Sequence, residues 1–366
     1  MTDIQTRPSA AHRWTKCSAA PLFASRSGPQ PSSDAAREGT CAAWVAELML
    51  TDRPVEIGMT HENGWEADAA MIDHMREYVE ICRADGGELW VETLVELRRH
   101  IAGTPDCVTL ADGVLTVRDL KYGFRLVAPD SPQLIIYAAA ILNAPPKRIH
   151  TIRTEIYQPR GFHQDGPRRW IDWTPDQIRE KAEWIIQRAD ECYKPEPIAT
   201  PGAHCLYCDG ASGCVALQQT TATALAIAEM TGHRDRSPEE MSQALHFYRN
   251  ALEIITAAAK ATEVEAEARA KRGERLPGWG LMPRQGNTRV KFPPAIIKAL
   301  TGKDATKTVP MGVADLKLAG LTAVQLSVIT ERPSTGHKLA PLDQDTLARQ
   351  LNRTTGPRHP TNDGDH

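Results

Sequence analysis

The sequence has no long apolar run and no strong excess of either charge. None of its segments reaches the ~18 uninterrupted apolar residues that a membrane-spanning helix needs. The N-terminal stretch MTDIQTRPSAAHRW lacks the apolar core of a secretory signal. The formal net charge of -3 excludes a globally basic surface, so any contact with nucleic acid must come from a local basic groove. We therefore expect a cytoplasmic protein with no membrane partner.

What the chain does have is length and cysteine. Its 366 residues are too many for one ordinary core and predict two or three folded units. In a reducing compartment the eight cysteines are not expected to form a disulfide framework, so clustered ones are better interpreted as metal ligands. The isolated ones lie among apolar residues and are expected to pack in the core: Cys41, Cys82, Cys107 and Cys192.

Apolar periodicity predicts an α/β core in the first 220 residues. A helix is expected over about 65 to 83, followed by the strand-like runs LWVETLVEL, CVTL and VLTVRDL, a helix, and the strand TIRTEIYQ. Thr174 and Gln177 form a capping-box pattern that predicts a further helix leading toward the later cysteines. Helices and strands in this order predict a mixed sheet flanked by helices.

The dipeptide Asp112-Gly113 predicts a tight hairpin turn between two of these strands, because both central residues of a type I′ turn need positive φ. In the resulting register, residue i faces residue 225 minus i, so Asp106 falls opposite Asp119. Asp119 and Lys121 share a face of their strand, while Leu120 points to the core.

Two carboxylates facing one another repel unless a cation lies between them. A hard divalent ion such as Mg²⁺ or Mn²⁺ suits oxygen ligands and keeps waters for substrate and nucleophile. Such an ion can polarise a phosphate, and a nearby lysine can neutralise developing charge. The pattern of Asp106, Asp119 and Lys121 therefore favours phosphodiester hydrolysis. An ordinary hairpin with polar residues on its solvent face is the open alternative.

These residues carry a resemblance. A glycine-led Asp106, then Asp119-Leu120-Lys121, then Gln133 and Tyr137 resembles the RecB-like branch of the PD-(D/E)XK nucleases, whose pattern is G-x-x-D, D/E-x-K and Q-x-x-x-Y. The resemblance implies a restriction-endonuclease-like core, with Asp106, Asp119 and the backbone carbonyl of Leu120 as metal ligands. Lys121 would be the catalytic lysine. Gln133 and Tyr137, one helical turn apart, would contact the DNA backbone or orient the site.

The sequence departs from that family at one position. The family places a metal-binding histidine three residues after a Gly-Thr pair, and here Gly39-Thr40 is followed at that position by Ala43. Glu47, one turn further along the predicted helix, is a candidate replacement ligand; otherwise it is a solvated helix residue. The departure leaves open a weakened or inactive site.

A second pattern is Cys205-x2-Cys208-x5-Cys214 in PGAHCLYCDGASGC. Zinc and iron–sulphur sites usually take four cysteines, so a distant fourth ligand is needed. The iron–sulphur nucleases of this superfamily, the CRISPR-adaptation and AddB-type exonucleases, have the same spacing after one earlier cysteine. This resemblance implies Cys17 as the fourth ligand of a 4Fe-4S cluster, with zinc as the alternative. The role would be structural, joining both ends of the domain.

The chain up to about residue 220 also resembles an uncharacterised phage and prophage nuclease family, through SAAHRWTKC, EGT, DLKYG, PQLIIYA, QPR and the last cysteines. We expect an iron–sulphur nuclease domain over 1–220 and a mainly helical C-terminal domain over 237–332. Within the latter, GWGLMPRQGNTRVKF predicts two short strands around a Gln-Gly-Asn turn, and the Pro-, Thr- and Asp-rich residues 333–366 predict a disordered tail.

The leading functional hypothesis is a metal-dependent DNA exonuclease, phage- or prophage-borne and so active in the host cytoplasm, that resects DNA ends for recombination. A recombination or single-strand annealing partner and an oligomeric state are left open. The alternatives are a catalytically weakened or inactive DNA-binding or assembly protein that keeps the fold and cluster, and a zinc-bound structural module.

Overall fold

The structure of the chain is a computed structural model. It describes residues 4–27, 32–144, 148–231, 237–285, 289–290, 294–301, 316, 321–331 and 334–341. The chain divides into two compact units, Met1–Ala258 and Ala259–His366. This division falls within one helix, and the predicted boundaries at residues 220 and 237 lie inside the first unit, where they remain predictions.

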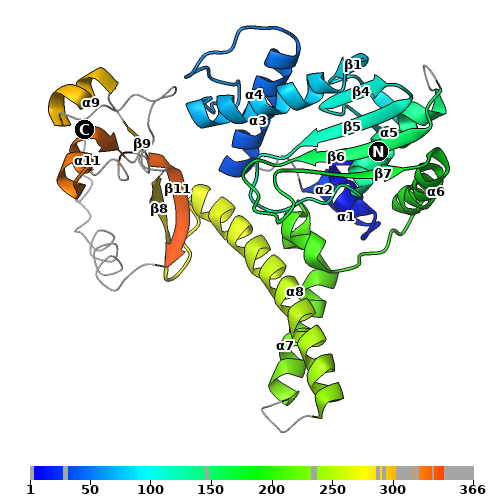
Figure 1. The fold of residues 1–366 in the computed structure, drawn as a ribbon. Coiled ribbons are helices and arrows are strands. Elements are labelled where there is room, and N and C mark those ends of the chain that lie inside the picture. The colour runs from blue at the N-terminus through cyan, green and yellow to red at the C-terminus, as the bar shows by residue number, and fades with distance from the viewer. Residues whose placement is uncertain are drawn as a thin grey trace, which may run out of the picture. The chain divides into compact units, whose positions relative to one another are not determined.

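A five-stranded mixed sheet forms the centre of the first unit (Figure 1). Its strand order is β1-β4-β5-β6-β7. Neighbouring strands are antiparallel except β5 and β6, which are parallel and are connected through a helix, as parallel neighbours require. The strands are β1 (Glu88–Val91), β4 (Cys107–Ala111), β5 (Val114–Leu120), β6 (Thr151–Tyr157) and β7 (Arg168–Trp173).

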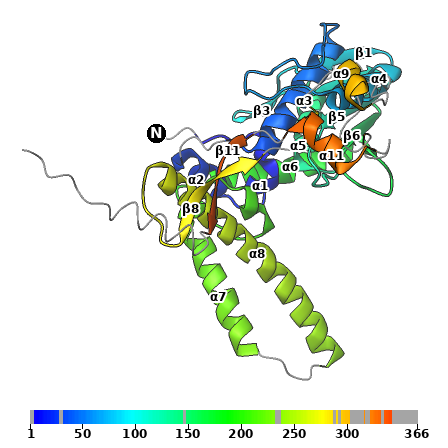
Figure 2. The same ribbon diagram turned by 90° about the vertical axis from the view of Figure 1, so that its left-hand side faces the viewer.

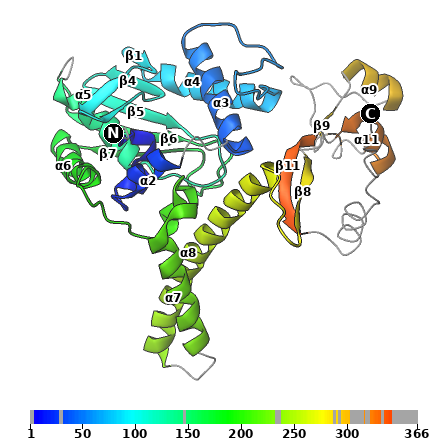
Figure 3. The same ribbon diagram turned by 180° about the vertical axis from the view of Figure 1, so that it is seen from behind.

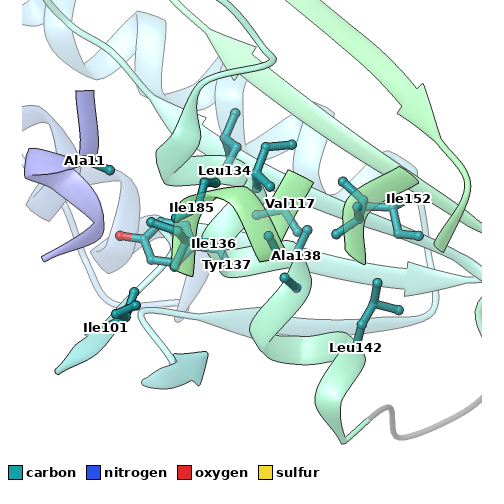
Figure 4. Close-up of a cluster of buried hydrophobic side chains, with 14 of the residues drawn as sticks. Ala11, Ile101, Val117, Leu134, Ile136, Tyr137, Ala138, Leu142, Ile152 and Ile185 are labelled. Atoms are coloured by element: carbon teal, nitrogen blue, oxygen red, sulfur yellow. The ribbon is translucent and has the colours of Figure 1, made fainter. Parts of the chain in front are cut away.

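Helices cover both faces of this sheet, because alternate residues of its strands point to opposite sides. Val117 belongs to a core formed with α5 (Pro132–Asn143) and α6 (Pro175–Cys192), part of which is drawn in Figure 4. Leu120 belongs to a core formed with α3 (Asp34–Leu50) and α4 (Ala69–Ala84). The predicted fold class, a mixed α/β sheet flanked by helices, is confirmed.

The N-terminal segment packs on the α5 and α6 side. It comprises the short helices η1 (Pro8–Ala10) and α1 (Ala11–Trp14) and the helix α2 (Ala20–Arg26), seen from behind in Figure 3. Thr6 Oγ1 donates to the carbonyl of His100 at 2.9 Å, and Arg188 Nε donates to the carbonyl of Thr15 at 2.7 Å. The start of the chain is therefore an integral part of the first unit.

A buried ion network fixes the middle of the sheet. Arg118 is fully buried, and its Nε donates to Glu155 at 2.9 Å across the β5–β6 pair. Its other nitrogens donate to Asp85 and, at 3.1 Å, to Thr109. Arg168 also donates to both oxygens of Glu155, each at 3.0 Å. A buried charge is tolerated when it is paired and hydrogen-bonded in this way.

The helix predicted from the Thr174–Gln177 pattern forms as expected. Thr174 caps α6 by accepting from the Gln177 N–H, while the Gln177 side chain accepts from the Thr174 N–H. The run LWVETLVEL, in contrast, is not one strand. It divides into β1 of the main sheet and β2 (Val95–Arg98), which pairs with β3 (Ile101–Gly103) in a separate two-stranded sheet. The break falls at Glu92, whose φ of 44° ends the extended backbone.

After the last cysteines come α7 (Val215–Thr231) and the long helix α8 (Pro238–Lys271), which is continuous in Figure 2. No helix within the described ranges is long and apolar enough to cross a membrane. In the second unit, β8 (Trp279–Gln285) pairs with β11 (Ser334–Pro341), and β9 (Arg289–Val290) pairs with β10 (Thr330–Glu331). The remaining described helices there are α9 (Pro294–Thr301) and α11 (Ala323–Ile329).

Two predictions for this unit need correction. The two short strands expected around the Gln-Gly-Asn turn form as β8 and β9, but among the described residues they pair with other strands and not with each other. The tail expected from residue 333 is wrong for residues 334–341, which form β11. Both errors have one cause, which is that strand pairing depends on distant residues and not on local composition. Strand β11 forms its backbone hydrogen bonds with β8, about fifty residues away. The rest of the predicted tail lies outside the described residues.

Candidate nuclease site and cysteine cluster

The β4–β5 hairpin has the predicted register. Cys107 pairs with Arg118 and Ala111 with Val114, so each pair of positions sums to 225. Asp112 and Gly113 have φ of 48° and 75°, as a type I′ turn requires. One step beyond the last pair, Asp106 lies across from Asp119. The turn therefore sets the position of both candidate metal-binding carboxylates.

Each carboxylate has a distinct set of contacts. Asp106 Oδ2 accepts the backbone N–H of Leu120 at 2.6 Å. Asp119 Oδ1 accepts a hydrogen bond from Lys121 Nζ at 2.9 Å. Asp119 Oδ2 is buried and accepts no well-oriented hydrogen bond, although Lys121 Nζ lies 2.7 Å from it. One buried carboxylate oxygen is thus left with lone pairs for another cation.

Charge repulsion and burial act together on this pair. Burial and the neighbouring Asp119 charge raise the pKa of Asp106 to about 7, against the opposing effects of Lys121 and the Leu120 N–H. Burial lowers the pKa of Lys121, but the charges of Asp119 and Asp106 outweigh it and raise the pKa overall. The site therefore favours the cationic form of Lys121 and shifts Asp106 toward its neutral form.

Helix α5 supplies the two polar residues predicted beside this pair. Gln133 Oε1 accepts from Lys121 Nζ at 3.3 Å, and Gln133 Nε2 donates to the Tyr137 hydroxyl at 3.4 Å. The Tyr137 ring lies among apolar side chains (Figure 4) and is only 3% exposed. A Cβ on Gly103 would lie 3.3 Å from that ring and 3.1 Å from Pro8, which accounts for the glycine that precedes Asp106. The contacts favour an orienting role for Tyr137 over contact with DNA.

Glu92 is a site residue that the sequence analysis missed. Strand β1 ends at Val91, which pairs with Cys107, and Glu92 follows directly; its charge is one of those that raise the pKa of Asp106. Partial burial, and after it the charges of Glu47 and Asp119, raise the pKa of Glu92, with an opposing hydrogen bond from Thr104. The sequence signal was an acidic residue directly after the apolar residues LWV. It was missed because LWVETLVEL was interpreted as one continuous strand that includes Glu92.

The structure does not bring Glu47 to the carboxylate pair by any contact. Glu47 lies on α3, one turn after Ala43, and its Oε1 accepts from Arg53 Nη2 at 2.5 Å. Its charge contributes to the raised pKa of Glu92, so it lies at the acidic margin of the site. The Leu120 carbonyl, the remaining predicted ligand, follows the Asp119 side chain on the same strand.

A divalent metal ion fits the donors of this site in part. As arranged, the described residues contain no group of three or more His, Cys, Asp or Glu side chains that could hold a metal ion. Mg²⁺, however, is commonly held by one or two carboxylates, with waters and substrate phosphates completing its shell. The two carboxylates of Asp106 and Asp119, the latter with an oxygen that accepts no hydrogen bond, match that lesser requirement.

The four predicted cluster cysteines line one small cavity. Cys17 follows α1, Cys205 lies in η2 (Ala203–Tyr207), and Cys208 and Cys214 precede and follow η3 (Ala211–Gly213). Residues far apart in the sequence thus meet, as the resemblance implied. The other four cysteines are buried elsewhere: Cys41, Cys82, Cys107 and Cys192.

Backbone N–H groups point at these sulphur atoms. Thr200 N–H donates to Cys17 Sγ and Gly202 N–H to Cys205 Sγ, each at 3.4 Å. Burial raises the pKa of Cys208 to about 11, and a hydrogen bond from the Gly210 backbone opposes that shift. A Cβ on Gly210 would approach Phe23 to 2.4 Å, so this loop needs glycine to close over α2. The donors favour thiolate over thiol once a cation enters.

A family model described as "Protein of unknown function (DUF2800)" matches residues 6–334. The chain belongs to this family. The matched range of this DUF2800 protein includes the carboxylate pair, Lys121 and all four cavity cysteines. No curated protein matches the chain.

Among solved structures, this DUF2800 protein is similar to an alkaline exonuclease (LHK-Exo) from Laribacter hongkongensis. The sequence identity is 16%, and the TM-score is 0.24. The match covers 50% of this chain and 90% of the exonuclease.

Proposed function

We propose that the chain is a metal-dependent nuclease that hydrolyses phosphodiester bonds in DNA. The observation that carries the proposal is the Asp106–Asp119 pair, held face to face by the hairpin register with an unsatisfied oxygen beside Lys121. An ordinary solvent-facing hairpin would not bury two carboxylates together, because their repulsion destabilises the fold. Strain of this kind is typical of functional sites.

Each side chain has a role that follows from its position. A bound Mg²⁺ or Mn²⁺ would supply Lewis acidity and a water of lowered pKa. Lys121 carries its positive charge beside Asp119, where it would neutralise charge that develops on a substrate phosphate. Gln133 holds the Lys121 amine through its amide oxygen, and Tyr137 in turn receives a hydrogen bond from Gln133. This chain of contacts limits the motion of the lysine.

The finer assignment follows the RecB-like motif pattern of the sequence. We propose an exonuclease that acts at DNA ends, encoded by a phage or prophage, with residues 1–220 as the nuclease domain and 237–332 as an appended domain. What supports the motif assignment is that Asp106, Asp119, Lys121, Gln133 and Tyr137 lie within one connected set of contacts or register pairs.

We further propose that Cys17, Cys205, Cys208 and Cys214 hold a 4Fe-4S cluster. The shared cavity and the N–H groups directed at its sulphurs support this assignment. A single zinc ion needs its sulphurs gathered at ~2.3 Å around one point. Zinc, held by the same four thiolates, is the alternative occupant.

The test of the nuclease is cleavage by the purified, cluster-containing protein. End-labelled linear duplex, single-stranded DNA and closed circular DNA would be incubated with Mn²⁺ or Mg²⁺ and with EDTA. We expect metal-dependent loss of the linear substrates, reduced ~10²- to 10³-fold in Lys121→Ala. Lys181→Ala, on the surface of α6, is the matched control and should keep full activity. Metal-independent cleavage, or equal activity in the two variants, would contradict the proposal.

A second candidate is a DNA-binding protein without turnover. Ala43 stands where the family pattern has histidine, and Glu47, its candidate replacement, is paired with Arg53 at 2.5 Å. A non-catalytic DNA-binding protein would bind DNA in a salt-sensitive way, because phosphate contacts release counterions. It would show no cleavage with any added metal ion. The same set of substrates and metals distinguishes the two functions.

A further inference from the structure

Two loops at the ends of β5 and β6 present exposed aromatic rings. The first loop, residues 122–127, directly follows Lys121, and the second, residues 158–163, directly follows β6. Phe124 is 69% exposed and Phe162 is 94% exposed. Large apolar rings at such exposure cost free energy in water, and two of them on adjacent loops indicate a binding surface.

A buried glutamine holds the two loops together. Gln158 is fully buried, and its Nε2 donates to the carbonyls of Gly123 at 2.7 Å and Arg125 at 2.8 Å. Its Oε1 accepts from Val127 N–H at 3.2 Å and from Arg169 at 2.7 Å. All four bonding positions of the amide are used. The first loop is therefore fixed in shape before any ligand binds.

The second loop approaches the first closely. A Cβ on Gly161 would lie 2.8 Å from the Gln158 side chain and 3.0 Å from Leu126, so only glycine permits this approach. Phe162 follows Gly161 directly in this loop, and Arg160, which precedes it, reaches the Phe124 ring. The loops form one rim, defined here as Phe124, Arg125, Arg160 and Phe162, with Tyr207 beside Arg125.

Arginine guanidinium groups lie over aromatic rings at this rim. The Arg160 guanidinium carbon is 4.2 Å from the Phe124 ring centre and 4.7 Å from that of Tyr122. Glu38 Oε1 forms an ion pair with Arg160 Nη1 at 2.7 Å. The Arg125 guanidinium carbon is 5.0 Å from the ring of Tyr207, and Arg125 has no ion-pair partner among the described carboxylates. Each arginine covers one face of a ring.

We propose that this rim binds unpaired DNA, with bases stacked on Phe124 and Phe162 and the backbone drawn along Arg125 toward Lys121. Aromatic faces with adjacent cations are the chemistry that recognises single-stranded nucleic acid, since every base has a face to stack and every nucleotide a negative charge. In a duplex, stacking covers the faces of all bases except the outer faces of the terminal pairs. The rim therefore favours a single-stranded or frayed DNA end as the substrate. The path of the strand toward Lys121 rests on the proposed nuclease function.

The test is binding of a fluorescent single-stranded oligonucleotide to the full-length protein in EDTA, where cleavage does not interfere. Phe124→Ala and Phe162→Ala should each weaken binding about 5- to 100-fold, as expected for loss of one stacked base. Phe124→Trp should retain binding, because it keeps a stacking face. Trp184→Ala is the control, since Trp184 is an exposed aromatic residue on α6, away from the rim.

The same oligonucleotide with abasic sites separates stacking from phosphate contact. Binding of the abasic strand should be weaker for the wild type and unchanged by Phe124→Ala. Equal losses on both strands, or wild-type affinity in both Phe variants, would overturn the proposal. If the wild type cleaves duplex ends with Mn²⁺ but binds no single strand, the rim proposal fails while the nuclease stands. Binding lost in the Phe variants without any cleavage supports the rim and removes the nuclease.

Discussion

Asp106 Oδ2 accepts a hydrogen bond from the backbone N–H of Leu120 at 2.6 Å. The carboxylate just before β4 is therefore bonded to β5, the strand that carries Asp119. The bond holds Asp106 in place where charge repulsion would otherwise move it away. A carboxyl group held in this way responds to protons and to metal, and both responses can be measured.

Stability without metal should depend on the charge of Asp106. Its folded pKa is raised to about 7, so folding favours the neutral acid. That contribution is complete below the unfolded pKa near 4 and is lost as the pH rises through 7. In EDTA at pH 8, Asp106→Asn should therefore be more stable than the wild type by about 1–2 kcal/mol, and equally stable at pH 4. Thermal melting at both pH values measures this, with exposed Asp130→Asn as the control.

Replacement of Glu92 should weaken metal binding. The charge of Glu92 raises the pKa of Asp106, and the pKa of Glu92 is itself raised by partial burial and by the charges of Glu47 and Asp119, which a cation would relieve. Glu92→Gln should lower Mn²⁺ affinity by about 10- to 100-fold in calorimetry. Glu96→Gln, on the exposed face of β2, should leave it unchanged. Unaltered affinity in Glu92→Gln would place the metal site away from this edge of the sheet.

Loss of one distant cysteine should remove the whole cluster. We expect anaerobically purified protein to contain about four irons per chain and to absorb visible light. Cys17→Ala should lose the iron and melt at a lower temperature, because the metal closes a loop of about two hundred residues. Cys192→Ala, buried in the α6 core, should keep its iron. Zinc in place of iron in the wild type would reassign the site.

The buried amide of Gln158 should control the order of the first loop. Gln158→Leu leaves the carbonyls of Gly123 and Arg125 and the Val127 N–H without partners, at a cost of about 1–3 kcal/mol for each group that stays buried. We expect a lower melting temperature and faster hydrogen exchange over residues 123–127. Gln5→Leu, near the N-terminus, is the comparison. Unchanged exchange in that loop would mean that Phe124 and Arg125 owe their position to other contacts.

The sequence predicted local geometry better than strand partners. Asp112-Gly113 determined the hairpin register, and Thr174 with Gln177 determined the start of α6, because each depends on a few adjacent residues. Glu92 was missed because its role depends on β1 pairing with β4, which no local pattern reveals. The β8–β11 pair was missed for the same reason. The Gln158 amide acts through loops whose approach depends on Gly161, a contact that only the folded chain contains.

The position of Cys17 sets an order of events during synthesis. Ser18 and Ile198 exchange hydrogen bonds, with Ile198 N–H donating to Ser18 Oγ at 2.9 Å, and Arg188 reaches back to Thr15. Thr15 and Ser18 thus find these partners only after the chain has grown past Ile198, and Cys17 meets the other cavity cysteines only after Cys214 is made. A nascent chain folds from its N-terminus as domains become complete. A translation product that ends before Arg188 would therefore leave Thr15 and Ser18 without these partners and open to proteolysis.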